Sequence, residues 1–231
     1  MEASQSNSVT IKRNGYSLVE LLLAMVVGTV VLGAAYSSYF VIAHQHSLLA
    51  ARSQIQESAL PTLHLLERHT RSAGLIAMDS NLDPVFSSIA DPIVITDSNN
   101  ACCDQLRITY DLSDGTAREQ VTFFVMPRTA PVRNALFMDI DQWNGVSWTN
   151  TVNDALVVDY VDDFQAEISS FTLTGRPKTI DLSMILHSPI VLNAPRTFTK
   201  PSYNVGNFDF TATENFFRDA FQTTVYIRNT Q

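Results

Sequence analysis

The chain has 231 residues, of which 45% are hydrophobic and 16% charged, so it can bury a core and is not a disordered polymer. Its formal net charge of -8 argues against a general nucleic-acid binder, because phosphate binding normally requires a basic stripe and the sequence shows none. We therefore expect one globular domain plus an additional segment.

The additional segment is an apolar run near the N-terminus. Between Leu18 and Ala43 the only charged residue is Glu20. A helix of that length rises by roughly 35 to 40 Å, which is enough to cross a bilayer core. Lys12 and Arg13 precede the run, and the positive-inside rule then predicts a cytoplasmic N-terminus with the bulk of the chain in the periplasm or outside the cell.

A cleaved secretory signal peptide is the competing interpretation, since the small residues 33–35 could form its cleavage site. Two features favour a helix that is retained. The apolar run passes without a break into an amphipathic pattern, which predicts one long helix over residues 16–72 with a transmembrane part at about 18–43. A signal peptide would also have no use for Glu20. At membrane depth a carboxylate costs a few kcal/mol and implies a function, whereas in the headgroup region it would only face the helix dipole.

The second half of the predicted helix carries an apolar stripe that includes Leu48, Ile55 and Leu66, so we expect this half to pack on a domain. Four histidines occur along the helix, but the pairs within reach lack the i, i+4 spacing that places two rings on one face. We interpret them as surface histidines rather than metal ligands. They are His44, His46, His64 and His69.

Residues 73–231 change to a period of two, which is typical of strands. The segments 105–112 and 120–126 predict a β-hairpin, because Asp114 and Gly115 between them form a strong turn signal. The C-terminal segment 215–229 begins with a helix-like pattern and ends as a strand. The predicted fold class is therefore α+β: a long N-terminal helix packed on a C-terminal antiparallel β-rich domain.

Further strands are expected across a turn within 155–175 and over 179–188, where Ile180, Leu182, Met184 and Leu186 alternate onto one face. Residues 79–104 are rich in Asp, Asn, Ser and Pro and predict long loops. Two groups of aspartates lack the regular calcium-loop pattern, so we interpret them as turn residues. They are Asp79 with Asp83, and Asp159 with Asp162 and Asp163.

Cys102 and Cys103 are the two cysteines of the chain and are adjacent in sequence. In an oxidising compartment they could close a vicinal disulfide or bond to a partner, and two reduced thiols in a loop are equally compatible with the sequence. Their neighbourhood in sequence lacks further metal ligands, so no metal is predicted. No motif of a nucleophilic hydrolase, phosphate-binding loop, zinc protease or dinucleotide site occurs, so we expect neither an enzyme nor a cofactor.

The stretch "KRNGYSLVELLLAMVVGTVVLG" resembles the class III signal of type IV prepilins and pseudopilins. The resemblance implies that residues 1–15 are a leader, that a membrane prepilin peptidase cuts between Gly15 and Tyr16, and that the new amine of Tyr16 is methylated. Gly15 suits this role because a residue without a side chain lets an extended backbone enter a peptidase cleft. Tyr16 departs from the family's usual phenylalanine but remains aromatic. The resemblance also makes Glu20 an assembly contact that could neutralise the new ammonium of a neighbouring subunit.

Two further segments resemble the PilW-type minor pilins: "LLERHTRSAGL" at 65–75 and "FFRDAFQTTVYIRN" at 216–229. That resemblance implies a pilin-like domain and a low-abundance subunit that helps to initiate type IV pilus assembly and stays near the pilus tip. The family is associated with cell adhesion and twitching motility. The implied partners are other minor pilins, the major pilin, the prepilin peptidase, the inner-membrane assembly platform and membrane lipid, without nucleic acid.

The same resemblance implies a single-pass protein of the bacterial inner membrane that later joins the pilus fibre at the cell surface. Two alternatives stay open from the sequence. One is a minor pseudopilin of a type II secretion system resembling GspJ, which has the same leader and helix. The other is a pilus-anchored module that binds a ligand or DNA, for which a basic or aromatic patch on the domain would be the sign.

Overall fold

The computed structural model describes residues 17–98, 102–129, 132–202, 204–206 and 209–229. It begins with one helix of 55 residues, α1 (Leu18–Ser72), which continues through Pro61. The chain divides into two compact units, Met1–Gln45 and His46–Gln231, so α1 contributes to both. We describe the two units separately.

The first sheet of the His46–Gln231 unit has five antiparallel strands in the order β1-β2-β3-β4-β5, each next to its neighbour in sequence. β2 and β3 form the predicted hairpin, and Gly115 in its turn has a φ of 69°, which favours glycine. The strands are β1 (Ile93–Thr96), β2 (Gln105–Asp111), β3 (Arg118–Thr129), β4 (Val132–Trp143) and β5 (Trp148–Asp159).

The second sheet has three antiparallel strands in the order β6-β7-β8. They are β6 (Val161–Phe171), β7 (Pro177–Thr199) and β8 (Thr211–Tyr226). A single residue, Tyr160, separates β5 from β6, and the chain changes from one sheet to the other at this point. The predicted pair of strands within 155–175 is therefore present, but its members belong to different sheets.

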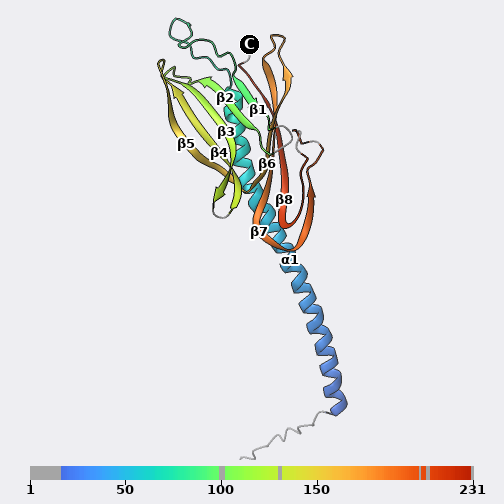
Figure 1. Ribbon diagram of the computed structural model, residues 1–231. Coiled ribbons are helices and arrows are strands. Elements are labelled where there is room, and N and C mark those ends of the chain that lie inside the picture. Colours follow the sequence, from blue (N-terminus) through green and yellow to red (C-terminus); the bar gives the residue numbers. More distant parts are fainter. Residues whose placement is uncertain (1–16, 99–101, 130–131, 203, 207–208, 230–231) are drawn as a thin grey trace, which may run out of the picture. The chain divides into compact units, whose positions relative to one another are not determined.

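One hydrophobic core joins both sheets to the second half of α1 (Figure 1). The helix contributes Ile55, Ala59 and Leu66, which lie on one stripe of its surface. The alternation predicted for β7 is present, since Ile180, Leu182, Met184 and Leu186 are all buried. A long apolar helix with antiparallel sheets confirms the α+β class.

Three expectations about the strands were incomplete or wrong. The C-terminal segment does not start as a helix, because β8 is extended from Thr211 and pairs with β7. The loop region 79–104 contains β1, whose four residues pair with β2. β4 was not predicted, although it pairs with β3 along its full length from Val132 to Trp143. In each case pairing with a neighbouring strand decides a local pattern that is weak by itself.

Candidate functional site

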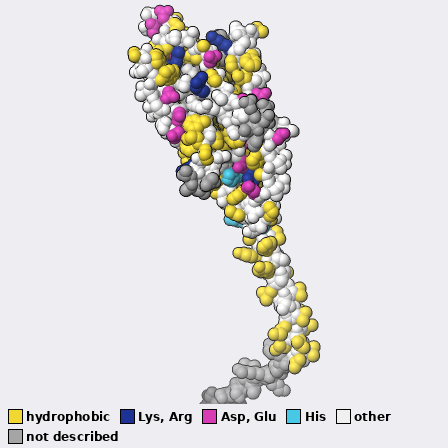
Figure 2. Space-filling model, viewed as in Figure 1, with side chains coloured by type: hydrophobic (Ala, Val, Ile, Leu, Met, Phe, Trp, Pro, Cys, Tyr) yellow, Lys and Arg dark blue, Asp and Glu magenta, His cyan; other side chains and the backbone are white. Residues whose placement is uncertain are grey.

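The first candidate region is the N-terminal half of α1, which exposes large apolar side chains in every direction. The consecutive residues Leu21, Leu22 and Leu23 point to three sides of the helix axis and are 56%, 53% and 66% exposed. Figure 2 shows hydrophobic side chains along this part of the helix. Among the described residues, α1 is the one helix long and apolar enough to cross a membrane. Such a surface requires lipid or other apolar partners.

Two polar side chains in this half are satisfied by the helix itself. Thr29 Oγ1 donates to the carbonyl oxygen of Val26 at 2.8 Å, and Ser37 Oγ donates to that of Ala34 at 2.9 Å. Hydroxyl groups bonded in this way lose little in an apolar medium, because no donor is left without an acceptor. The helix surface is therefore suited to a membrane at these positions as well.

Glu20 lies in the first turn of α1, where the backbone amide of Leu21 donates to the carbonyl oxygen of Ser17 at 3.1 Å. Its side chain is exposed and has no hydrogen-bond or ion-pair partner among the described residues. Gly15 and Tyr16, between which the sequence predicts cleavage, lie outside the described residues. The structure thus places the carboxylate of Glu20 but not the cleavage site.

The second candidate region is a set of ion pairs where the two sheets meet. The Arg128 Nη1 atom donates to both carboxylate oxygens of Asp159 at 3.0 Å, and Arg133 donates to them from Nε at 3.1 Å and Nη2 at 2.9 Å. Burial acts to raise the pKa of Asp159, but the two guanidinium groups outweigh it and hold that pKa below its ordinary range. Asp159 is therefore a structural anion between β3, β4 and β5.

Tyr160 continues this network across the change of sheet. It has a φ of 63°, which is unusual for a residue with a bulky side chain and costs about 1 to 3 kcal/mol. Its hydroxyl accepts a hydrogen bond from Arg133 Nη1 at 3.1 Å, and the guanidinium lies 4.4 Å from the ring centroid. The ring of His187 contacts the Tyr160 ring edge to face at 5.2 Å. These contacts fix the backbone at the point where the chain leaves β5.

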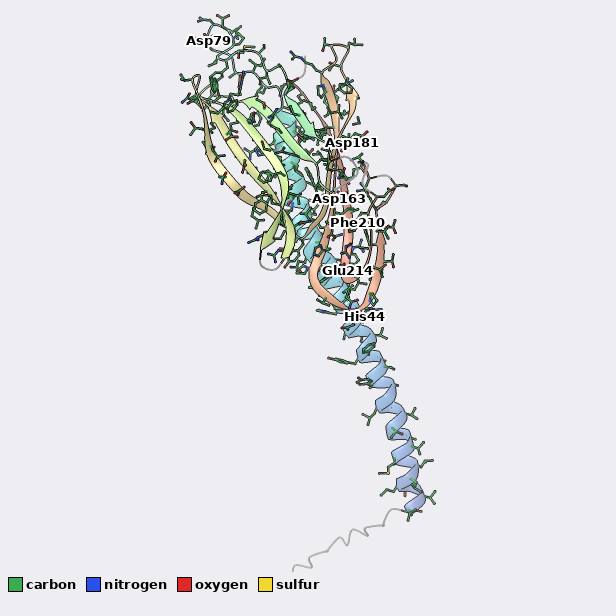
Figure 3. All side chains as sticks on the ribbon, viewed as in Figure 1. His44, Asp79, Asp163, Asp181, Phe210 and Glu214 are labelled. Atoms are coloured by element: carbon green, nitrogen blue, oxygen red, sulfur yellow. A yellow bond between two sulfur atoms is a disulfide. The ribbon has the colours of Figure 1, made fainter. Side chains whose placement is uncertain are left out.

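His187 links Tyr160 to the second sheet. Its Nδ1 atom lies 3.0 Å from Oδ1 of Asp162, and the other oxygen of Asp162 accepts from Arg218 Nε at 2.8 Å. Arg218 also donates to Glu214 on the same strand at 2.8 Å. Figure 3 labels Glu214 on β8 and Asp163 on β6, next in sequence to Asp162. The network thus joins β6, β7 and β8 to Tyr160.

A groove of about 570 Å³ opens beside this network, within the His46–Gln231 unit. Ile55 and Leu65 of α1, Leu156 of β5 and Leu186 of β7 supply apolar walls, while His187 and Asp159 supply polar groups. Its volume and mixed lining fit those of sites that receive a small molecule or a partner's side chains. Exposed residues of α1, such as Gln54, Glu57 and Ser58, also line the groove, so it is open to solvent along the helix.

The third candidate region surrounds the two cysteines. Cys102 and Cys103 are joined by a disulfide, and their sulfur atoms lie with a carboxylate oxygen of Asp163 inside a group whose atoms are all within 4.8 Å of one another. Asp163 is fully buried, accepts from Gln165 Nε2 at 2.8 Å and pairs with Lys200 Nζ at 3.3 Å. Burial raises the pKa of Asp163 despite these two partners.

Several side chains have other roles than the sequence analysis expected. Asp159 on β5 and Asp162 and Asp163 on β6 are not turn residues. Each pairs with a largely buried cation from elsewhere in the chain: Arg133, Arg218 and Lys200 respectively. Asp79 does act in a turn, since its Oδ1 atom accepts from the amides of Asn81 and Asp83. His69 is not a surface histidine, because its Nδ1 atom hydrogen-bonds the Tyr110 hydroxyl at 2.9 Å.

The functional groups that sequence reasoning missed are Arg133, Tyr160, His187 and Arg218. Each contributes to the network through partners that are distant in sequence, such as Asp159 for Arg133 and Asp162 for Arg218. No local motif marks them. The one local signal is that Tyr160 lies within 155–175, where two strands across a turn were expected.

The comparison with known protein families gives one match: residues 11–36 fit the prokaryotic N-terminal methylation motif. No curated protein and no solved structure matches the chain. The matched range contains Gly15, Tyr16 and Glu20 and overlaps the exposed apolar part of α1. The motif together with this helix supports a membrane-anchored structural protein of the type IV pilin and pseudopilin superfamily.

Proposed function

We propose that this protein is a minor pilin that takes part in the initiation of type IV pilus assembly and stays at or near the pilus tip. The methylation motif over residues 11–36 carries this proposal. The leader, residues 1–15, is removed by prepilin peptidase between Gly15 and Tyr16, and the amine of Tyr16 is methylated. The apolar half of α1 first lies in the inner membrane with the N-terminus cytoplasmic and the globular unit periplasmic, and then in the fibre.

The role proposed for Glu20 is to pair with the amine that cleavage creates. Its carboxylate is exposed and without a partner among the described residues, in a helix half whose other side chains are uncharged and mostly apolar. An unpaired carboxylate at membrane depth costs a few kcal/mol, so a cation there would be strongly favoured. The methylated ammonium of Tyr16 on a neighbouring subunit is such a cation. Docking of the subunit into the fibre then brings the two charges together.

The size of the globular unit supports a position at the fibre end. It extends from His46 to Gln231 and contains two sheets, with a loop region over 73–92. In a subunit repeated along a thin fibre, this bulk would crowd the neighbouring copies, whereas one copy at the end would not. The partners would be other minor pilins, the major pilin and the assembly platform.

Cleavage is tested with Gly15→Ala, which places a side chain where the peptidase needs a bare backbone. The variant should keep the mobility of the unprocessed chain on a denaturing gel, while wild type shifts. Gly28→Ala is a matched control, because an added Cβ there meets nothing within 4 Å among the described residues. Processing of Gly15→Ala at the wild-type rate would refute the cleavage site.

The docking role is tested with Glu20→Gln, which keeps the shape of the side chain and removes the charge. Processing should be intact, and recovery of the protein in sheared pili should fall at least about tenfold, the effect of losing roughly 1.4 kcal/mol. Glu57→Gln, an exposed carboxylate farther along α1, is the control that should incorporate normally. Equal recovery of the two variants would contradict the role of Glu20.

Deletion of the gene, with paired assays of surface pili and type II secretion, tests the assignment as a whole. Loss of pili with normal secretion is the expected result. Loss of secretion with normal pili would instead identify a GspJ-like pseudopilin. Normal pili and secretion together with loss of binding to a surface or to DNA would identify a pilus-anchored binding module.

A further inference from the structure

We propose that the reduced thiolates of Cys102 and Cys103, together with the carboxylate of Asp163, bind a thiophilic divalent cation such as Zn²⁺. The ligand atoms of these three residues all lie within 4.8 Å of one another. Ligands at about 2.3 Å (sulfur) and 2.1 Å (oxygen) from a tetrahedral ion lie roughly 3.5 to 3.8 Å apart, so small side-chain rotations suffice. From the sequence the cysteines had no further ligand nearby, because Asp163 lies on a distant strand.

Both sulfur atoms lie beside β6, within 4.8 Å of a carboxylate oxygen of Asp163, although the two cysteines are adjacent in the chain. Asp104, the next residue, fixes this placement. Its backbone amide donates to the carbonyl oxygen of Phe164 at 2.8 Å, and its Oδ2 atom accepts from the amide of Ala166 at 3.0 Å. The segment with the cysteines is thus held against the part of β6 that carries Asp163. A site pre-positioned in this way loses little entropy when an ion binds.

The character of the ligands selects the ion. Two thiolates and one carboxylate favour Zn²⁺ or Cd²⁺ over Mg²⁺ or Ca²⁺, which prefer oxygen ligands alone. Asp163 is fully buried, and Gln165 and Lys200 hold its two oxygens in place. The half-buried cysteines leave one side open, so a water molecule can complete a four-coordinate shell.

Binding requires prior reduction of the disulfide. A dithiol reductant attacks one sulfur, the bond between the sulfurs breaks, and two electrons and two protons convert it to two thiols while the reductant becomes a disulfide. The cation then binds the sulfurs and displaces both thiol protons. The oxidised form has no thiolate to offer, so the site is open to the ion in one redox state and closed in the other.

The test uses the full chain in detergent, reduced with a phosphine and freed of reductant without oxygen. Titration with Cd²⁺ should give thiolate-to-metal charge-transfer absorption that saturates at one equivalent, and oxidised protein should give none. Cys102→Ser should abolish the absorption. Asp163→Asn should retain it and weaken binding by at least about tenfold. Asp181→Asn, a partly exposed carboxylate on β7 outside the cluster, is the matched control and should bind like wild type.

A variant at the buried Asp163 could fail to fold, so wild type supplies an independent measurement. X-ray absorption of the reduced protein loaded with Zn²⁺ should show two sulfur neighbours near 2.3 Å and oxygen neighbours near 2.1 Å. Absence of charge transfer in reduced wild type, or a zinc shell without two sulfurs, would overturn the proposal. Equal Cd²⁺ affinity of a folded Asp163→Asn variant and wild type would also overturn it.

Discussion

The two halves of α1 share one backbone conformation and differ in what surrounds their side chains. Over residues 18–43 almost every side chain is exposed, although most are apolar. In the half that belongs to the globular unit, Ile55, Ala59 and Leu66 are buried in the core with residues of both sheets. The backbone is α-helical in both halves, so the side chains determine which medium each half requires.

The carboxylates of the two regions differ in the same way. Glu20 is exposed and has no partner among the described residues, whereas Asp111 at the end of β2 is fully buried. Asp111 accepts from Arg118 Nε at 2.6 Å and from the backbone amide of Ala77 at 3.1 Å. In the globular unit a charge is therefore compensated within the chain. In the apolar half, the described part of the chain offers Glu20 no such partner.

Several substitutions test this difference between the globular unit and the apolar half. Asp111→Ala should have the largest effect on the free energy of unfolding. The substitution leaves the guanidinium of Arg118 buried without its carboxylate, and it removes the acceptor of the Ala77 amide. We expect the free energy of unfolding to fall by about 4 kcal/mol. Denaturant titration of the full chain in detergent, followed by tryptophan fluorescence, measures it, because both tryptophans, Trp143 and Trp148, lie in the globular unit.

Glu20→Ala is the matched variant in the apolar half. It should leave the fluorescence midpoint of the globular unit at the wild-type value, since Glu20 belongs to the other compact unit, Met1–Gln45. The proposed difference between the two regions would be contradicted if Asp111→Ala and Glu20→Ala shifted the denaturation midpoint equally. It would also be contradicted if Asp111→Ala unfolded at the wild-type denaturant concentration.

The next largest effect on the free energy of unfolding is expected from a buried leucine, which we compare with an exposed one. Leu66 is fully buried and Leu32 is 70% exposed. Leu66→Ala should lower the free energy of unfolding by about 3 kcal/mol, through lost burial and the cavity left in the core. Leu32→Ala should not change it measurably in the same fluorescence titration. A large effect of Leu32→Ala would mean that the apolar half stabilises the globular unit.

The parts of the fold that the sequence predicted are those with strong local signals. The helix from residue 16 to residue 72 was expected from its periodicity, and α1 runs from Leu18 to Ser72. The hairpin of β2 and β3 followed from Asp114 and Gly115, whose turn requires a left-handed residue. These features depend on residues that are neighbours in the chain, so a single sequence contains the information.

The parts that were missed depend on distant partners. The start of β8 has Phe216, Phe217, Ala220 and Phe221, a spacing that is also typical of one helix face, and pairing with β7 makes it a strand. The ion pairs of Arg133 and Arg218 join residues that are 26 and 56 positions apart. Nothing in the local pattern indicates which carboxylate each arginine will meet. The proximity of Asp163 to the two cysteines could not be predicted either, because these residues lie far apart in the chain.

The smallest expected effect is on the pH dependence of stability and concerns His69. This histidine is packed, whereas His64 on the same half of the helix is exposed. Burial, and then the charge of Arg68, lower the pKa of His69 below its ordinary value of 6.5, while Glu119 opposes them. The unfolded chain therefore binds the proton more tightly than the folded one. Stability should be full above about pH 6.5 and should decrease as the pH falls from there toward the folded-state pKa.

His69→Gln should remove this part of the pH dependence, measured as the denaturation midpoint between pH 7.5 and 5, since glutamine does not titrate. The Tyr110 hydroxyl donates to Glu119 at 2.7 Å, so it can still accept from the glutamine amide in place of the ring. His64→Gln, whose side chain is 80% exposed, is the control that should keep the pH dependence due to His69. An unchanged pH profile in a folded His69→Gln variant would show that packing against β2 does not control the protonation of this histidine. The contrast between buried and exposed faces of α1 would then concern apolar side chains only.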